Sequence, residues 1–222
     1  MVAAVRLLLV LALLAAVCEC FVPTTATSAS AALAYARRHQ LQMSSSVAPA
    51  SKKKVLIVGG TRFSGLYLWK ELHERGHEVT LFNRGKTALK AIPGEDASVF
   101  AKRSQETNFV KGDRKDVAGM KEKLGSLKFD VVYDMGGREA DDTVPLVDMF
   151  GKTAEQFVYM SSAGVYKKSL LMPHKEGDAE DPKSRHKGKL ETEAMLRTRG
   201  VPFTSIRPTY IYGPLNYNPI GR

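Results

Sequence analysis

Cysteine is almost absent from this chain of 222 residues. Its two cysteines, Cys18 and Cys20, both lie in the first twenty residues, a segment that we expect to be removed. The mature protein then has no thiol, which excludes disulfides, cysteine nucleophiles and cysteine-ligated zinc. Internal repeats, coiled-coil heptads and an apolar run long enough to span a bilayer are also missing from the sequence. We therefore expect no stable membrane insertion.

Acidic residues are missing between Phe21 and Lys70, a stretch rich in Ser, Thr and Ala. Such a composition is typical of an organellar transit segment. Earlier, Arg6 precedes the eleven apolar residues 7–17, which match the hydrophobic region of a signal peptide. A signal peptide over residues 1–20 followed by a transit segment over 21–50 resembles the bipartite presequences of algae with complex plastids. We expect import into the chloroplast or plastid stroma, with secretion as the alternative.

Basic residues outnumber acidic ones in the remainder of the chain. Residues 51–222 contain 30 Lys and Arg against 22 Asp and Glu, a net charge of +8. A basic surface favours polyanions such as nucleic acid. A solvated charge excess or a phosphate-bearing cofactor explains the same surplus, so charge alone does not decide between them.

After Ser51, strand-like and helix-like segments alternate, which predicts an α/β domain over residues 51–222. We expect a Rossmann-like, doubly wound parallel sheet with strand order 3-2-1-4-5-6. The expected strands are residues 54–58, 78–82, 107–111, 129–134, 155–160 and 203–207. The expected helices are 65–75, 115–124, 140–151 and 186–199, and 84–106 is a long connection. Because the sequence ends soon after the sixth strand, we expect the C-terminal substrate domain to be missing, through truncation or because only the nucleotide-binding half is kept; we favour truncation.

Residues 55–65 are the most informative stretch. An apolar run breaks into a glycine-rich turn and then a helical pattern, which indicates a dinucleotide-binding strand-turn-helix. Glycines allow a tight turn in which backbone N–H groups meet a pyrophosphate at the positive end of the helix. Arg62 replaces the middle glycine, so its guanidinium contacts phosphate or its bulk alters nucleotide access. The predicted cofactor-binding residues of this turn are Gly59, Gly60, Thr61, Arg62, Phe63 and Gly65.

The ends of the next strands bear on the choice of cofactor. The second strand ends in Asn83 and Arg84, without the acid that binds the ribose 2′-hydroxyl of NAD, so we predict NADP if a dinucleotide binds. Asp113, after the third strand, is placed near the adenine, although a loop or helix cap explains it equally well. Asp113 and Asp134 do not form a metal pair, because their strands lie three spacings apart, about 14 Å. The sequence identifies no metal ligands.

The fifth strand runs into Ser161 and Ser162, and here the sequence resembles extended short-chain dehydrogenase/reductases. The resemblance implies that Ser162 bonds the reacting oxygen and that Lys189 is the lysine of the Tyr-x-x-x-Lys motif, in which the ammonium lowers the pKa of the catalytic phenol. The tyrosine position holds Arg185, and a guanidinium does not deprotonate in proteins. We therefore expect no ordinary alcohol–ketone hydride chemistry. Tyr166 is a candidate replacement, although a core or loop position explains it better.

Several strings are distinctive together: residues 59–65, 83–85, 112–116, 161–166, 181–189 and 207–217. They resemble the chloroplast stem-loop-binding protein family, atypical plastid members of the short-chain dehydrogenase/reductase superfamily, over about residues 52–220. The resemblance implies binding of structured plastid transcripts or ribosomal RNA, with roles in their processing and stability. It also implies endoribonuclease activity assisted by a divalent metal such as Mg²⁺, and homo- or hetero-oligomers with a family paralogue.

Four cations in seven residues support RNA binding modestly, because Lys and Arg neutralise phosphates; they are Lys183, Arg185, Lys187 and Lys189. His174 and His186 are candidate acid/base groups for RNA cleavage, although a surface histidine is the commoner case. Tyr210, Tyr212 and Tyr217 are candidates for stacking on unpaired bases, with turn packing as an equal alternative.

Three interpretations stay open, and we favour the first. It is a plastid RNA-binding protein, with or without endoribonuclease activity. The second is an NADP-dependent oxidoreductase of the epimerase/dehydratase type that uses Ser162 and Lys189 with a replacement for the tyrosine. The third is a catalytically silent scaffold whose nucleotide pocket senses redox state.

Overall fold

The computed structural model describes residues 51–171 and 173–216. The predicted signal peptide (1–20), the transit segment (21–50) and Tyr217 lie outside the described residues. A six-stranded parallel sheet in the order β3-β2-β1-β4-β5-β6 confirms the predicted doubly wound topology. Its strands are β1 (Lys54–Val58), β2 (Glu78–Asn83), β3 (Asn108–Lys111), β4 (Val131–Asp134), β5 (Gln156–Met160) and β6 (Phe203–Ile206).

The central strands read as continuous apolar runs because helices cover both faces of the sheet. Four of the five residues of β1 and all four of β4 are buried. In the sheet register Ile57 of β1 lies between Leu81 of β2 and Tyr133 of β4. β3, at one edge, is mostly exposed.

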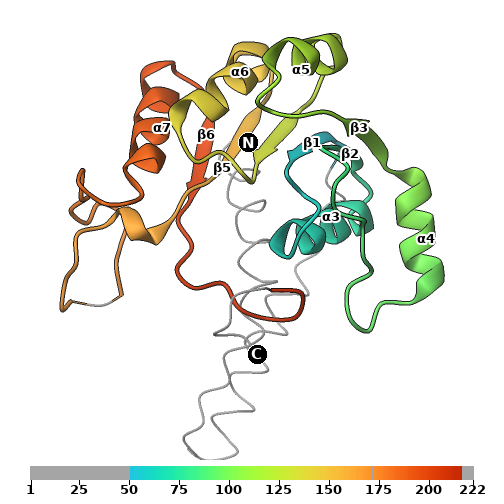
Figure 1. Ribbon diagram of the computed structural model, residues 1–222, viewed down its shortest axis with the longest axis horizontal. Coiled ribbons are helices and arrows are strands. Elements are labelled where there is room, and N and C mark those ends of the chain that lie inside the picture. The colour runs from blue at the N-terminus through green and yellow to red at the C-terminus, as the bar shows by residue number, and fades with distance from the viewer. Residues whose placement is uncertain (1–50, 172, 217–222) are drawn as a thin grey trace, which may run out of the picture. The chain divides into compact units, whose positions relative to one another are not determined.

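The helices divide between the two faces as Figure 1 shows. One face carries α3 (Ser64–Glu74) and α4 (Ala97–Glu106), and the other carries α5 (Val117–Leu124), α6 (Ala140–Phe150) and α7 (Lys187–Thr198). A short 3-10 helix, η1 (Ala163–Val165), follows β5. A hydrophobic core lies under the second group, where Val132 and Phe157 pack with Leu146 and Leu196. Within the described ranges, no helix has the length and apolar character needed to cross a bilayer.

Helix α4 corrects the prediction that residues 84–106 are a long connection. Its N-cap is Asp96, whose carboxylate accepts a hydrogen bond of 2.7 Å from the backbone N–H of Ser98. The one buried residue of this helix is Arg103. A helix that turns a cation toward the protein interior has no apolar stripe, so hydrophobic periodicity does not reveal it.

Arg103 attaches α4 to α3. Its side chain is fully buried and forms an ion pair with Glu95, whose side chain is 2% exposed. The guanidinium lies 4.4 Å from the centroid of the Trp69 ring. The indole N–H of Trp69 donates to the hydroxyl of Thr107 (2.8 Å), which in turn donates to the backbone carbonyl of Arg103 (2.7 Å). The Arg103 side chain thus occupies an interior position that an apolar side chain normally fills.

We expect Glu95→Ala to lower the free energy of unfolding by about 3–5 kcal/mol, because it leaves the Arg103 guanidinium buried without its carboxylate. Equilibrium unfolding in urea measures the change. Arg75→Ala, which removes an exposed pair with Glu71 one helical turn away, is the control and should cost less than about 0.5 kcal/mol. Similar losses in the two variants would show that the buried pair has no special role.

Candidate functional site

The turn between β1 and α3 requires glycine for steric reasons. Gly59 has a φ of 90°, which residues with a side chain rarely adopt. A Cβ at Gly65 would lie 2.7 Å from Cα of Gly60, so the start of α3 touches the turn backbone. The N-cap is Phe63, and no side chain caps this helix. An uncapped helix start behind a glycine turn suits a phosphate group.

A cavity of about 220 Å³ opens beside this turn, at the carboxyl ends of β2 and β3. The side-chain oxygen of Asn83 accepts from the backbone N–H of Gly85 (2.8 Å), and Nε of Arg62 donates to Thr87 Oγ1 (3.2 Å) at the rim. In a doubly wound fold this place receives the adenosine half of a dinucleotide. The described lining contains no acid and consists of Thr61, Asn83, Gly85, Thr87, Leu89, Phe109, Val110 and Lys111.

Of the predicted cofactor residues, Thr61 and Asn83 belong to that lining, whereas Arg84 and Asp113 lie outside it, as do the other residues of the glycine turn. Arg84 is exposed on the loop after β2. Asp113 accepts a hydrogen bond of 3.0 Å from the backbone N–H of Lys115, which is the loop role named as its alternative; the N-cap of α5 is Asp116. Lys111, which the sequence did not single out, lines the cavity and packs against Gly85, where a Cβ would lie 3.3 Å from Cδ of the lysine.

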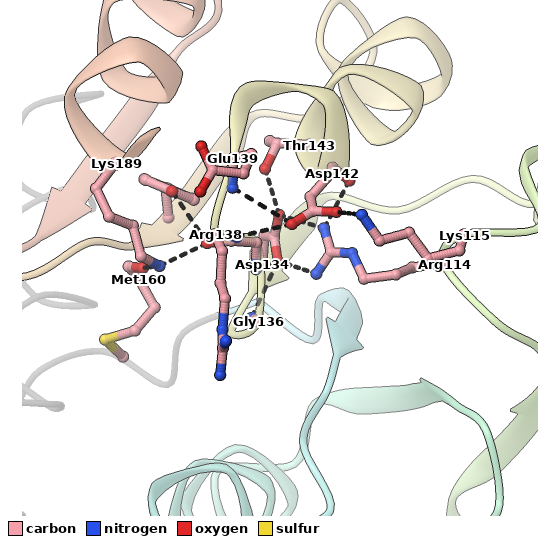
Figure 2. A network of polar contacts seen from close by, with 12 residues as sticks. Arg114, Lys115, Asp134, Gly136, Arg138, Glu139, Asp142, Thr143, Met160 and Lys189 are labelled. Atoms are coloured by element: carbon pink, nitrogen blue, oxygen red, sulfur yellow. Dashed lines mark hydrogen bonds and ion pairs between the residues drawn. The ribbon is translucent and has the colours of Figure 1, made fainter. Parts of the chain in front are cut away.

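A buried carboxylate organises the carboxyl end of β4 (Figure 2). Asp134 has no exposed surface and accepts two hydrogen bonds of 2.9 Å from Arg114 and one of 2.8 Å from Thr143. The backbone N–H groups of Gly136 and Gly137 donate to it at 3.1 and 2.9 Å. Burial alone would raise the pKa of Asp134, but Arg114 and the other donors outweigh burial and lower it.

The same donors occupy the oxygens that a metal would need. Asp134 therefore does not fit a metal ligand. Within the described ranges, no three His, Cys, Asp or Glu side chains come together as a metal site. The described residues therefore do not fit the divalent metal implied for a nuclease.

Asp142 holds the loop that follows β4. The backbone N–H groups of Arg138 and Glu139 donate to its carboxylate at 3.0 and 3.3 Å, and Lys115 forms an ion pair with it. Burial alone would raise the pKa of Asp142, but the hydrogen bonds from Lys115 and the two N–H groups outweigh burial and lower it to about 2. Capping therefore explains the acidic start of α6.

Lys189 reaches the same loop from α7. Its ammonium donates to the carbonyl oxygens of Gly137 (2.5 Å) and Met160 (2.6 Å), and it lies 4.9 Å from the centroid of the Tyr159 ring. The Tyr159 hydroxyl also donates to Gly137, at 3.1 Å. Burial lowers the pKa of Lys189. The structure thus places this lysine in the loop network, apart from the other three cations predicted to bind RNA.

Three predicted site residues meet around Gly164. The imidazole of His186 packs on this glycine, where a Cβ would lie 2.5 Å from Cδ2 of the ring. Ser162 Oγ accepts from the Gly164 N–H at 3.1 Å. Arg185, two residues before the first residue of α7, donates from Nε to His186 Nε2 at 3.0 Å. Burial, and then the charges of Arg185 and Lys189, lower the pKa of His186.

The aromatic candidates lie elsewhere. The ring of Tyr166 stacks on His174 with centroids 4.9 Å apart, and the Arg207 guanidinium lies 4.8 Å from the centroid of the Tyr166 ring. Tyr166 is therefore packed in its own loop. Tyr210 and Tyr212 are 70% and 54% exposed on the segment after β6.

Sequence reasoning missed Arg138. This residue is exposed on the loop after β4, and Figure 2 shows its side chain directed away from the polar network. The signal was present: a cation follows the glycine pair Gly136 and Gly137 at the carboxyl end of a central strand.

The profile of the NAD dependent epimerase/dehydratase family matches residues 55–222. The chain belongs to this family. It is also 55% identical, over 183 residues, to an Arabidopsis thaliana protein named chloroplast stem-loop binding protein of 41 kDa b, chloroplastic. That match covers 82% of this chain and 48% of the relative, so the chain spans about half the length of the curated relative that it matches.

Several solved structures share the fold. WbmH of Bordetella bronchiseptica, in complex with NAD+, aligns with a TM-score of 0.59 and 24% identity over 75% of this chain and 59% of that one. UDP-glucose 4-epimerase from Brucella ovis, in complex with NAD, aligns with a TM-score of 0.56 and 22% identity over 72% and 51% of the chains. At these identities the likeness concerns the fold alone.

The residues of this epimerase/dehydratase family member fit a dinucleotide. The glycine turn would hold the pyrophosphate, and Asn83 and Lys111 lie where the adenosine ribose would sit. A bound NAD(P) supplies a hydride acceptor or donor. The preference for NADP stays a prediction.

We expect Asp142→Asn to lower the free energy of unfolding at pH 7 by about 1–3 kcal/mol, because the charged acceptor of three hydrogen bonds is lost. The folded pKa of Asp142 is depressed from 3.8 to about 2, so its contribution is present above about pH 4 and is lost as pH falls through the folded pKa. The difference between wild type and variant, measured by urea unfolding, should shrink between pH 7 and about pH 2.5.

Asp141→Asn is the matched control, since Asp141 is an exposed neighbour on the same helix. It should change stability by less than about 0.5 kcal/mol at both pH values. A wild-type advantage over Asp142→Asn that stays constant down to about pH 2.5 would contradict the assignment.

Proposed function

We propose that this chain is a plastid RNA-binding protein that acts in the processing or stability of chloroplast transcripts or ribosomal RNA. The observation that carries the proposal is its 55% identity, over 183 residues, to a relative named a chloroplast stem-loop binding protein. The net charge of +8 over residues 51–222 favours an RNA partner as well. Arg185 stands where the superfamily has its proton-transfer phenol, which counts against ordinary hydride chemistry.

The proposed RNA surface is the segment before and at the start of α7. Lys183, Arg185 and Lys187 are exposed there, and none of the three forms an ion pair within the part of the chain that the structure describes. Charge that carboxylates do not neutralise is available to phosphates. Lys189 is left out of this surface because backbone carbonyls already accept from its ammonium.

Endoribonuclease activity is the finer part of the proposal. His186 is the candidate base, because its lowered pKa keeps the ring neutral at physiological pH. Its Nε2 accepts a hydrogen bond from Arg185, so this contact must be released before Nε2 takes a proton. As base, Nε2 would take the proton of an RNA 2′-hydroxyl, whose oxygen would bond to the adjacent phosphorus while the 5′-oxygen leaves and takes a proton from water.

The alternative is an NADP-dependent oxidoreductase of the epimerase/dehydratase type. Two features favour it: the glycine turn, and the neighbouring cavity whose described lining lacks an acid. It needs a proton donor other than residue 185, and Tyr166 is held by His174 and Arg207.

RNA binding is tested by titrating a plastid stem-loop RNA into the 222-residue chain over a salt series. The triple variant Lys183→Ala, Arg185→Ala, Lys187→Ala should bind more weakly, and the slope of log affinity against log salt should flatten by about 2, since each lost phosphate contact removes about 0.7–0.9. The control variant Lys128→Ala, Lys152→Ala, Arg197→Ala removes equal charge from loops and a helix end at the amino edge of the sheet and should leave the slope unchanged.

Calorimetry with NADP+ separates the two functions. Tight NADP+ binding combined with negligible, salt-insensitive RNA binding favours the oxidoreductase. Normal RNA binding with an unchanged slope in the first triple variant removes this segment from the RNA surface.

We expect residues 1–50 to carry a fused fluorescent protein into the plastid stroma of an alga with a complex plastid. Removing residues 1–20 should leave the fusion in the cytosol, because the signal peptide acts first in a bipartite presequence. Fluorescence microscopy distinguishes these outcomes. Secretion of the longer fusion would show that residues 21–50 do not direct plastid import.

A further inference from the structure

The loop of residues 135–139, between β4 and α6, touches both halves of the candidate site. On one side, a Cβ at Gly59 in the glycine turn would lie 3.8 Å from the backbone nitrogen of Gly136. On the other side, a Cβ at Gly188 in the first turn of α7 would lie 2.7 Å from the carbonyl oxygen of Arg138. The loop therefore joins the predicted cofactor turn to the proposed RNA surface.

The backbone of this loop is fixed by charged groups. Asp134 accepts from the N–H groups of Gly136 and Gly137, and Asp142 accepts from that of Arg138. Lys189 donates to the carbonyl of Gly137. These contacts leave the loop little freedom, so a side chain on it is displayed at low entropic cost.

The side chain displayed is that of Arg138. It is exposed, and Figure 2 shows it extending away from the network that holds its backbone. Within residues 51–171 and 173–216, no ion pair or side-chain hydrogen bond engages its guanidinium. A planar guanidinium suits two oxygens of one phosphate.

The sheet order sets the spacing of the cations. The cavity lies at β2 and β3, Arg138 follows β4, and the segment of residues 183–187 lies beside η1, which follows β5. Lys111 ends β3, and from β3 to β5 is four strand spacings, about 19 Å. The carboxyl edge of the sheet therefore carries a row of three cations, Lys111, Arg138 and Arg185.

The cavity indicates what kind of RNA fits this line. Phe109, whose side chain is 42% exposed, and Leu89 belong to its lining, so apolar residues border a space of about the size of one base. A base inside a duplex is stacked and cannot enter such a space, whereas an unpaired base can.

We propose that unpaired RNA binds along the carboxyl edge of the sheet, with one base in the β2–β3 cavity and its phosphates on Lys111, Arg138 and the cations before α7, so that RNA and dinucleotide exclude each other. This proposal rests on the proposed RNA-binding function. Exclusion follows because the adenosine and pyrophosphate of a dinucleotide would fill the same cavity and turn.

The test uses fluorescence anisotropy with the 222-residue chain and two probes: a hairpin RNA with an unpaired loop, and a blunt RNA duplex of equal length. Arg138→Ala should weaken hairpin binding about tenfold through the loss of one charge-assisted phosphate contact, and Arg138→Lys should restore part of it. Lys128→Ala at the amino edge should have no effect. The duplex should bind more weakly than the hairpin.

NADP+ is then added to the hairpin complex at constant ionic strength. At about ten times its own dissociation constant, measured by calorimetry, NADP+ should raise the apparent dissociation constant of the hairpin about elevenfold. The competition identifies a shared site, which charge alone does not produce.

The outcomes distinguish a failure of the RNA-binding function from a failure of the shared site. If the wild-type chain binds neither RNA, the proposed function fails and this inference fails with it. If the hairpin binds but Arg138→Ala leaves its affinity unchanged, or saturating NADP+ leaves it unchanged, the shared edge is wrong and the RNA-binding function stands.

Discussion

The buried carboxylate of Asp134 is the group on which the candidate site depends. A charge without access to water is tolerable only when donors surround it, and Arg114, Thr143 and two glycine N–H groups do so here. Two of those donors belong to the loop after β4, so satisfying the charge also fixes that loop. The loop that contacts the glycine turn on one side and α7 on the other is thus held partly by this one neutralised carboxylate.

Lys189 contacts the same loop of residues 135–139 and has a different role there from the superfamily lysine. The family resemblance implies a lysine whose ammonium lowers the pKa of a phenol four residues earlier. Here the ammonium donates to the carbonyls of Gly137 and Met160, and residue 185 lies before the helix begins. The lysine stabilises the meeting of β5, the loop and α7. Lys189 therefore matches the position of the superfamily lysine without having to perform its chemistry.

The fold could be predicted from the sequence, because buried strands appear in it as apolar runs. The six strands in the predicted order and the four predicted helices agree with the structure. Helix α4 was not readable, because its interior residue is Arg103 and its partner Glu95 lies in the preceding loop. Charged contacts between distant residues have no periodicity, so they emerge only once the chain is folded.

The candidate site shows the same contrast between local patterns and contacts of distant residues. Glycines that a turn requires were identified, since their spacing is local and their steric cause is simple. The exposed position of Arg138 was not identified, because it depends on the hydrogen bonds that Asp134 and Asp142 accept from the loop backbone. The pairing of Arg114 with Asp134 was not identified either, because it joins the ends of the third and fourth strands, which lie three spacings apart in the sheet. A long side chain on the loop after β3 spans that gap. Spacing between Cα atoms thus ruled out a shared metal for Asp113 and Asp134, but it did not rule out an arginine reaching across.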